Sequence, residues 1–155
     1  MDNEQAKLIA GLIQDMIQQM GVDARVEVED GVRGKIFNIS SPDSNLLIGQ
    51  HGANLYALQI LITALAVKNH GVVERFSIDV DDYRRKREWY LRETAKKAIE
   101  QVKRTHRPVV LEPMPAYERR VIHAFLSEDF SVETESTGFE PNRRIVIKPK
   151  PRGGI

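Results

Sequence analysis

The sequence predicts an α+β protein made of two small domains, residues 1–81 and 82–150, followed by a flexible tail at residues 151–155. Helical and strand periodicities occur in both parts, which is typical of mixed folds. The charge changes sign between them: residues 1–81 hold 6 Lys/Arg and 11 Asp/Glu, whereas residues 82–155 hold 17 and 11. An acidic half joined to a basic half indicates two units, with any contact to a polyanion expected mainly in the second.

The first domain is predicted to run helix, strand, strand, short helix, long helix, strand. Apolar residues at helical spacing indicate an amphipathic helix over residues 3–20. The segments "ARVEVED" and "RGKIFNIS" alternate as strands do, with a turn at Asp30-Gly31 between them. The segment "SPDS" begins a short helix that runs into Gly49, a long apolar helix follows Gly52, and "ERFSIDV" forms the third strand.

The second domain is predicted to contain a small sheet packed on helices. A long helix covers most of "YRRKREWYLRETAKKAIEQVKRTHR", and the four basic residues 84–87 at its start are expected to form a solvated face. After the short extended run "VVLEPM", a second helix begins at Pro115. Its inner face is expected to consist of Tyr117, Val121, Ala124 and Phe125. The segments "FSVETES" and "RRIVIKP" then read as the two strands of a hairpin.

A Gly-Gln-His-Gly loop, formed by Gly49, Gln50, His51 and Gly52, lies between the two helices in the middle of the first domain. Glycines let the backbone approach a ligand closely, because no Cβ stands in the way. The first N–H groups of the following helix and the positive end of its dipole face the same space, which favours phosphate. The plainer alternative is a tight turn between two core helices.

In this element order the loop resembles the GXXG loop of a KH domain of the bacterial type (type II), over residues 1–81. The resemblance implies that the loop clamps about four nucleotides of a single strand. The variable pair of this loop is often basic in the family, whereas here it is Gln50-His51 in an acidic domain. The departure leaves open a KH fold kept for packing or for contact with a protein partner, such as another KH protein.

The segment "PAYERRVIHAFL" places Arg119 and His123 four residues apart, on one face of the predicted helix and opposite its apolar stripe. An arginine can fork onto a phosphate or stack on a base, and a histidine can donate to phosphate. The alternative is a solvated polar face, or a pair that only braces the local fold.

The longer stretch "LEPMPAYERRVIHAFLSEDFSVETESTGFEPNRRIVIKP" resembles the domain named for its Arg-x-x-x-His signature, a single-stranded nucleic-acid binder. The signature pair maps onto Arg119 and His123, and the flanking arginines that could extend a phosphate track are Arg120, Arg143 and Arg144. A KH domain followed directly by this domain resembles the Jag family of bacterial RNA-binding proteins (also called KhpB or EloR). Members of that family usually carry a further small N-terminal domain, and functions that depend on it are not expected of this stretch.

The resemblance implies a cytoplasmic, non-enzymatic binder of single-stranded RNA that is connected with cell elongation and envelope growth. Single-stranded DNA is the alternative ligand, and a small KH-domain protein is a candidate partner. The sequence contains no Cys and no phosphate-loop, dinucleotide or zinc-protease motif, so no cofactor or metal is expected. Its longest apolar stretch, residues 55–67, is too short to span a bilayer. A protein-interaction adaptor remains the second hypothesis and a hydrolase the third.

Overall fold

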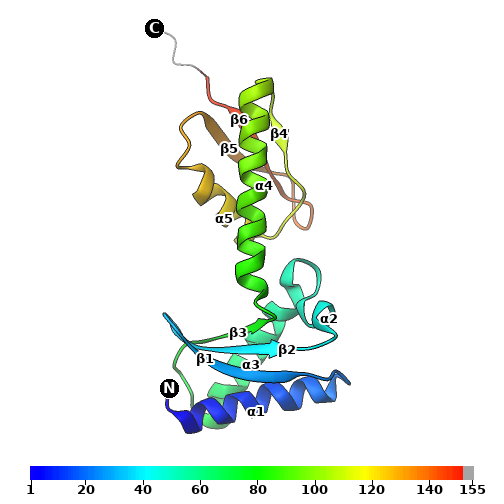
Figure 1. Ribbon diagram of the computed structural model, residues 1–155, viewed down its shortest axis with the longest axis vertical. Coiled ribbons are helices and arrows are strands. Elements are labelled where there is room, and N and C mark those ends of the chain that lie inside the picture. The colour runs from blue at the N-terminus through cyan, green and yellow to red at the C-terminus, as the bar shows by residue number, and fades with distance from the viewer. Residues whose placement is uncertain (152–155) are drawn as a thin grey trace. The chain divides into compact units, whose positions relative to one another are not determined.

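The computed structural model describes residues 1–151, and the chain forms two compact units, Met1–Arg84 and Arg85–Ile155 (Figure 1). Both are α+β, as predicted. The first unit extends past residue 81 because Tyr83 packs against its core and the backbone N–H of Arg84 donates to the Asp79 carboxylate at 3.3 Å. The predicted tail, apart from Pro151, lies outside the described residues. No helix within residues 1–151 is both long enough and apolar enough to cross a membrane.

The first unit has the predicted order of elements. They are α1 (Asn3–Gln19), β1 (Arg25–Gly31), β2 (Gly34–Ser40), α2 (Ser44–Ile48), the 3-10 turn η1 (Gln50–Gly52), α3 (Ala53–His70) and β3 (Phe76–Val80). The sheet has the order β1-β2-β3, with β1 and β2 antiparallel and β2 and β3 parallel. Helices α1 and α3 cover one face, where Phe37, Ile39 and Ile78 are fully buried (Figure 1). This packing holds the loop between α2 and α3 at one edge of the unit.

The second unit packs two helices on a three-stranded antiparallel sheet of order β4-β6-β5. Its elements are α4 (Tyr83–Thr105, of which the first two residues belong to the first unit), β4 (Val109–Val110), α5 (Ala116–Leu126), β5 (Val132–Thr137) and β6 (Arg144–Pro149). The core joins Leu91 and Ala95 of α4, Ile122 of α5, and Ile145 and Ile147 of β6. Strand β5 lies at the edge of the sheet, beside the C-terminal half of α5.

The predicted inner face of α5 was wrong. Tyr117 and Ala124 are exposed, and Val121 and Phe125 are only partly buried. The helix instead buries Glu118, Arg119, Ile122 and Leu126. Two charged residues therefore share the buried face with two aliphatic ones, which is possible because both charges are paired inside the unit. The periodicity of the apolar residues alone pointed to the wrong face.

Candidate nucleic-acid interface

The loop between α2 and α3 has a backbone that only certain residues tolerate. Gly49 has φ 71° and ψ 179°, a region that is essentially restricted to glycine. His51 (φ 54°) and Gly52 (φ 78°) follow in left-handed conformations. A Cβ placed on Gly49 would lie 2.6 Å from Cγ and 2.9 Å from the backbone N of Asn54. The first glycine is therefore required by the fold of the loop, whatever the loop binds.

Short hydrogen bonds fix this loop against both helices. The N–H of Gly49 donates to the Asn45 carbonyl at 2.9 Å, and that of Gly52 donates to the Gly49 carbonyl at 3.2 Å. The Asn54 side chain donates to the Leu46 carbonyl at 2.7 Å, which ties the first turn of α3 to α2. Gln50 is exposed and His51 half-buried, so the predicted loop residues lie together at the start of an 18-residue helix.

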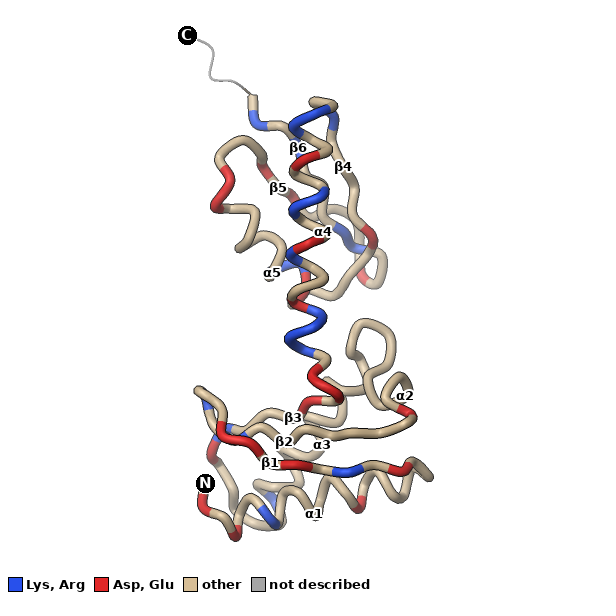
Figure 2. The backbone as a smooth tube through the Cα atoms, in the orientation of Figure 1, with Lys and Arg blue, Asp and Glu red and all other residues tan. Residues whose placement is uncertain are grey.

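The electrostatics of the loop come from its backbone. Residues 36–67 contain no Lys or Arg, so the tube in Figure 2 has no basic position in α2 or in the loop between α2 and α3. The one Lys of α3, Lys68, lies in the last turn of that helix, far from the loop in sequence. A phosphate here would meet only the positive end of the α3 dipole and backbone N–H groups. Attraction from a distance, which needs net positive charge, is weak at this loop.

Substitution of Gly49 by alanine is expected to lower the free energy of unfolding of the first unit by about 2–3 kcal/mol, from backbone strain and from the contact with Asn54. Gly71 provides a matched control, since it has φ 63° after α3 and open space where a Cβ would lie. Gly71→Ala is expected to cost about 1 kcal/mol. The free energy of unfolding of each variant is measured by amide hydrogen exchange in α1 at increasing urea concentration. Equal losses for the two variants would contradict the close approach at Gly49.

In the second unit, Arg119 is 8% exposed and holds three segments together. Its Nε donates to the Met114 carbonyl at 3.1 Å, and Nη1 donates to the Ser136 hydroxyl at 2.8 Å. Its Nη2 forms an ion pair with the Glu140 carboxylate. The guanidinium thus links the segment before α5, strand β5 and the loop between β5 and β6. Arg119 therefore braces the hairpin. Its Nε, Nη1 and Nη2 all donate within the protein, and these are the same N–H groups that would donate to a phosphate.

His123 lies one turn after Arg119 on α5 and contacts Thr134 of β5, which is on the same face of the strand as Ser136. Its Nδ1 lies 2.6 Å from the Thr134 hydroxyl, and the ring is half-buried. Burial, and secondarily the positive charge of Arg119, lower the pKa of His123 below its ordinary value of 6.5. The spacing predicted that Arg119 and His123 share a helix face, and both side chains indeed contact β5, at Ser136 and Thr134.

The lowered pKa of His123 gives an expected pH dependence. The folded state favours the neutral ring, so this contribution to stability is complete above pH 6.5 and is lost as the pH falls through the lower pKa of the folded state. An NMR titration of the His123 ring should give a midpoint below 6.5. His123→Gln should remove that part of the pH dependence of unfolding. A midpoint at or above 6.5 without ligand would contradict the effect of burial.

The other predicted arginines lie around the same hairpin. Arg143 donates from Nη1 to the Gly138 carbonyl at 2.7 Å and from Nη2 to the Ser136 carbonyl at 3.5 Å. Ser136 therefore accepts hydrogen bonds from both Arg119 and Arg143. Arg144 begins β6, and its Nε donates to the Asn142 carbonyl at 3.3 Å. Arg120 is exposed on α5. The structure brings Arg119, Arg143 and His123 to one strand, while the Gly49–Gly52 loop belongs to the other unit.

Two features of the second unit were missed by the sequence reasoning. Glu118 is fully buried and is held in a fork by Arg87 of α4, with Nε–Oε1 at 2.7 Å and Nη2–Oε2 at 3.0 Å. Arg87 was expected on a solvated face. Phe139, at the tip of the hairpin, is 89% exposed beside Glu140, the partner of Arg119. An aromatic residue inside the turn segment "TGFEPN" was the available signal for this second feature.

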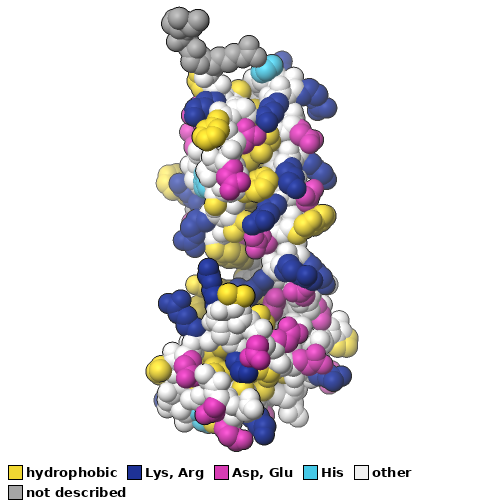
Figure 3. All heavy atoms as spheres, turned by 60° about the vertical axis from the view of Figure 1, so that its left-hand side comes forward, with side chains coloured by type: hydrophobic (Ala, Val, Ile, Leu, Met, Phe, Trp, Pro, Cys, Tyr) yellow, Lys and Arg dark blue, Asp and Glu magenta, His cyan; other side chains and the backbone are white. Residues whose placement is uncertain are grey.

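The surface of the second unit offers cations and hydrogen-bond donors. Figure 3 shows Lys and Arg side chains spread over the part of this unit that faces the viewer, with acidic side chains between them. Within residues 1–151 no three His, Asp or Glu side chains are grouped so that they could hold a metal ion.

The amino-acid sequence is similar to one known domain family and to several named proteins. Residues 90–149 match the family model of the R-3-H domain, which is the domain named for its Arg-x-x-x-His signature. A protein named RNA-binding protein KhpB from Clostridium symbiosum is 40% identical over 131 residues, which are 84% of this chain and 59% of that protein. A protein of the same name from Lactiplantibacillus plantarum is 36% identical over 133 residues, which are 85% of this chain and 41% of the relative. The chain thus spans only about half the length of these two relatives.

A third protein named RNA-binding protein KhpB, from Bacillus subtilis (strain 168), is 34% identical over 150 residues. The match covers 95% of this chain and 70% of that protein, so both units take part in the similarity. The position of the signature domain after an N-terminal α+β unit agrees with the expectation from the sequence. The chain belongs to the KhpB family, and its residues 90–149 are the Arg-x-x-x-His signature domain.

Proposed function

We propose that this chain is a non-enzymatic protein that binds single-stranded RNA, with its stronger contact on the second unit. The observation that carries the proposal is the convergence of Arg119 and Arg143 on Ser136, with His123 on Thr134 of the same strand. The names of the relatives, RNA-binding protein KhpB, support it. As the family resemblance implies, the proposed role is cytoplasmic post-transcriptional regulation linked to cell elongation and envelope growth.

The two units contribute differently in this proposal. Arg143, Arg144 and Arg120 supply charge that attracts phosphates, while Arg119 mainly keeps the hairpin in place. The Gly49–Gly52 loop adds a backbone contact at the start of α3, with little charge of its own. Two weak contacts in one chain raise the apparent affinity, because the second contact forms at a high effective concentration.

Arg143→Gln combined with Arg144→Gln is expected to weaken RNA binding several-fold and to lower the salt slope by about 1.4, since about 0.7 counterions are released per phosphate on a single strand. Fluorescence anisotropy with matched single-stranded RNA and DNA at several salt concentrations measures both quantities. The matched control is Arg92→Gln with Lys96→Gln, two exposed α4 residues that pair with Glu88 and Glu93. Equal effects of the two double variants, or affinity that does not change with salt, would contradict the proposal.

The contribution of the loop is tested by Gln50→Asp with His51→Asp, which places two negative charges where the phosphate backbone is proposed to lie. Asn69→Asp with His70→Asp makes a similar change at the exposed far end of α3. We expect the first double variant to weaken RNA binding and the second to leave it nearly unchanged. Unchanged binding for the loop variant would restrict the RNA contact to the second unit.

An exposed apolar face on α3 favours an adaptor as the second candidate function. Four of its side chains are between 47% and 58% exposed: Tyr56, Ile60, Leu61 and Val67. Their spacing places them along one side of the helix, and contiguous apolar surface of this kind marks interaction sites. The proposed partner is another protein of KH fold. Leu61→Glu should abolish association with it, whereas Val73→Glu, at an exposed valine outside α3, should not.

A further inference from the structure

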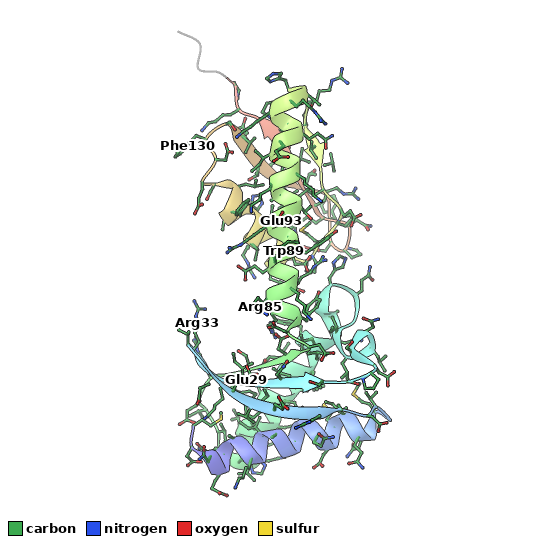
Figure 4. All side chains as sticks on the ribbon, in the orientation of Figure 1. Glu29, Arg33, Arg85, Trp89, Glu93 and Phe130 are labelled. Atoms are coloured by element: carbon green, nitrogen blue, oxygen red, sulfur yellow. The ribbon has the colours of Figure 1, made fainter. Side chains whose placement is uncertain are left out.

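A groove of 590 Å³ opens in the second unit, near the end of α4 and the start of β5. The residues in its wall that matter here are Lys103, His106, Phe130, Ser131, Pro149 and Lys150. None of them belongs to the Arg119–His123 signature or to its flanking arginines. Phe130 is 82% exposed, and Figure 4 shows its side chain projecting outward from the segment between α5 and β5.

The charge around Phe130 differs between its two sides. The groove contains two lysines and a histidine, and no acidic residue among the described residues that line it. A second hollow of 460 Å³ also touches Phe130 and Lys103, but it is lined by Glu100, Glu128 and Asp129 as well. An anionic ligand that uses the Phe130 ring would therefore enter the first groove and avoid the second.

The Lys103 side chain and the backbone at Lys150 are held in position. The Lys103 ammonium donates to the Asp129 carboxylate at 2.9 Å, and hydrogen bonds from Ser131 and Lys103 lower the pKa of Asp129 to about 2. Asp129 therefore stays ionised and keeps Lys103 at the rim. The backbone N–H of Lys150 donates to the Ser131 carbonyl at 2.9 Å, which fixes the last described residues of the chain beside β5.

We propose that this groove binds one nucleotide of a single-stranded RNA, with the base stacked on Phe130 and the phosphate facing Lys103 and Lys150. An aromatic ring beside cations is the usual means of holding an unpaired nucleotide, since every base has a face that can stack. Ser131 lies three residues before Thr134, which is about 10 Å along an extended strand. A single strand that contacts His123 would therefore have to span about this distance to reach the groove. The inference rests on the proposed RNA binding.

The test measures binding of single-stranded oligouridylate to the full chain by fluorescence anisotropy. Phe130→Leu keeps apolar volume but removes the ring, and it should weaken binding about fivefold or more, the loss expected for one stacked base. Phe130→Trp should retain the affinity. Lys150→Gln should weaken binding more than Lys96→Gln, since Lys96 lines only the acidic hollow. Cross-linking with 5-iodouridine RNA, mapped by mass spectrometry, should mark the peptide that contains Phe130.

Wild-type affinity for both Phe130→Leu and Lys150→Gln would overturn this inference and would point to a protein segment as the occupant of the groove. If Arg143→Gln with Arg144→Gln still weakened binding, the proposed function would stand without it. If the wild-type chain bound no RNA, both would fall together. Both groove positions lie at the surface, and unchanged thermal unfolding of the variants would show that a loss of affinity is local.

Discussion

Replacement of Glu118 by alanine is expected to lower the free energy of unfolding of the second unit by about 3–5 kcal/mol. Glu118 is fully buried, and both its oxygens accept hydrogen bonds from Arg87. The variant removes the buried carboxylate that pairs with Arg87, whose own side chain is 24% exposed, and breaking such a pair by removing one partner is strongly destabilising. Amide hydrogen exchange in β6, measured at increasing urea concentration, reports on the unfolding of the second unit alone. A measurement on one unit is needed because two units need not unfold in one step.

A surface ion pair in the same unit supplies the control. The Lys96 Nζ lies 3.0 Å from Oε1 of Glu93 on α4, and the two side chains are 56% and 34% exposed. Such solvated pairs contribute less than about 1 kcal/mol. Glu93→Ala should therefore have little effect. The double variant Arg87→Met with Glu118→Leu should recover most of the stability, because a packed apolar pair avoids the desolvation of two charges. If Glu118→Ala cost no more than Glu93→Ala, the Arg87–Glu118 pair would not support α5.

Replacement of Arg119 by alanine is expected to lower the free energy of unfolding of the second unit by about 2–3 kcal/mol. The change leaves the Met114 carbonyl, the Ser136 hydroxyl and the Glu140 carboxylate without the donor they share. Arg119→Lys should recover less than half of this loss, since one ammonium cannot reach three acceptors as a planar guanidinium does. The same unfolding experiment measures both variants, and an unchanged stability for Arg119→Ala would contradict the bracing role.

Glu140→Gln separates a bracing role of Arg119 from a direct contact with RNA. If the guanidinium binds a phosphate, Glu140 competes for it, and Glu140→Gln should raise RNA affinity. If Arg119 only holds the hairpin, the same variant should lower stability and leave affinity unchanged or reduced. We expect the second result, because the Arg119 residue is only 8% exposed while the Glu140 side chain is 58% exposed. Loss of RNA binding in Arg119→Ala alone would not distinguish the two roles.

The predictions that succeeded rest on local signals. The order of elements in the first unit followed from apolar periodicity and the glycines of the loop. The turn predicted at Asp30-Gly31 was wrong by two residues, because both residues pair with β2 as the end of β1 and the chain turns at residues 32–33. The position of α5 followed from Pro115, after which the helix begins at Ala116. Such features are readable because each depends on the conformation of a few neighbouring residues. The candidate site residues of the second unit also came from a pattern of residue types along the chain, and their contact with nucleic acid stays a prediction.

The sequence by itself determined the element order, the loop of Gly49–Gly52 and the placement of Arg119 and His123 on one face of a helix. Only the tertiary structure decided which face of α5 is buried, because Arg87 reaches Glu118 across 31 residues and Glu140 reaches Arg119 across 21. The pattern of apolar residues along a helix assigns charged residues to the exposed face. Burial of a charged side chain requires a partner of opposite charge, and here that partner is distant in the sequence. The groove at Phe130 was also decided only by the tertiary structure, since its walls come from α4, the start of β5 and the end of the described chain, which are far apart in the sequence.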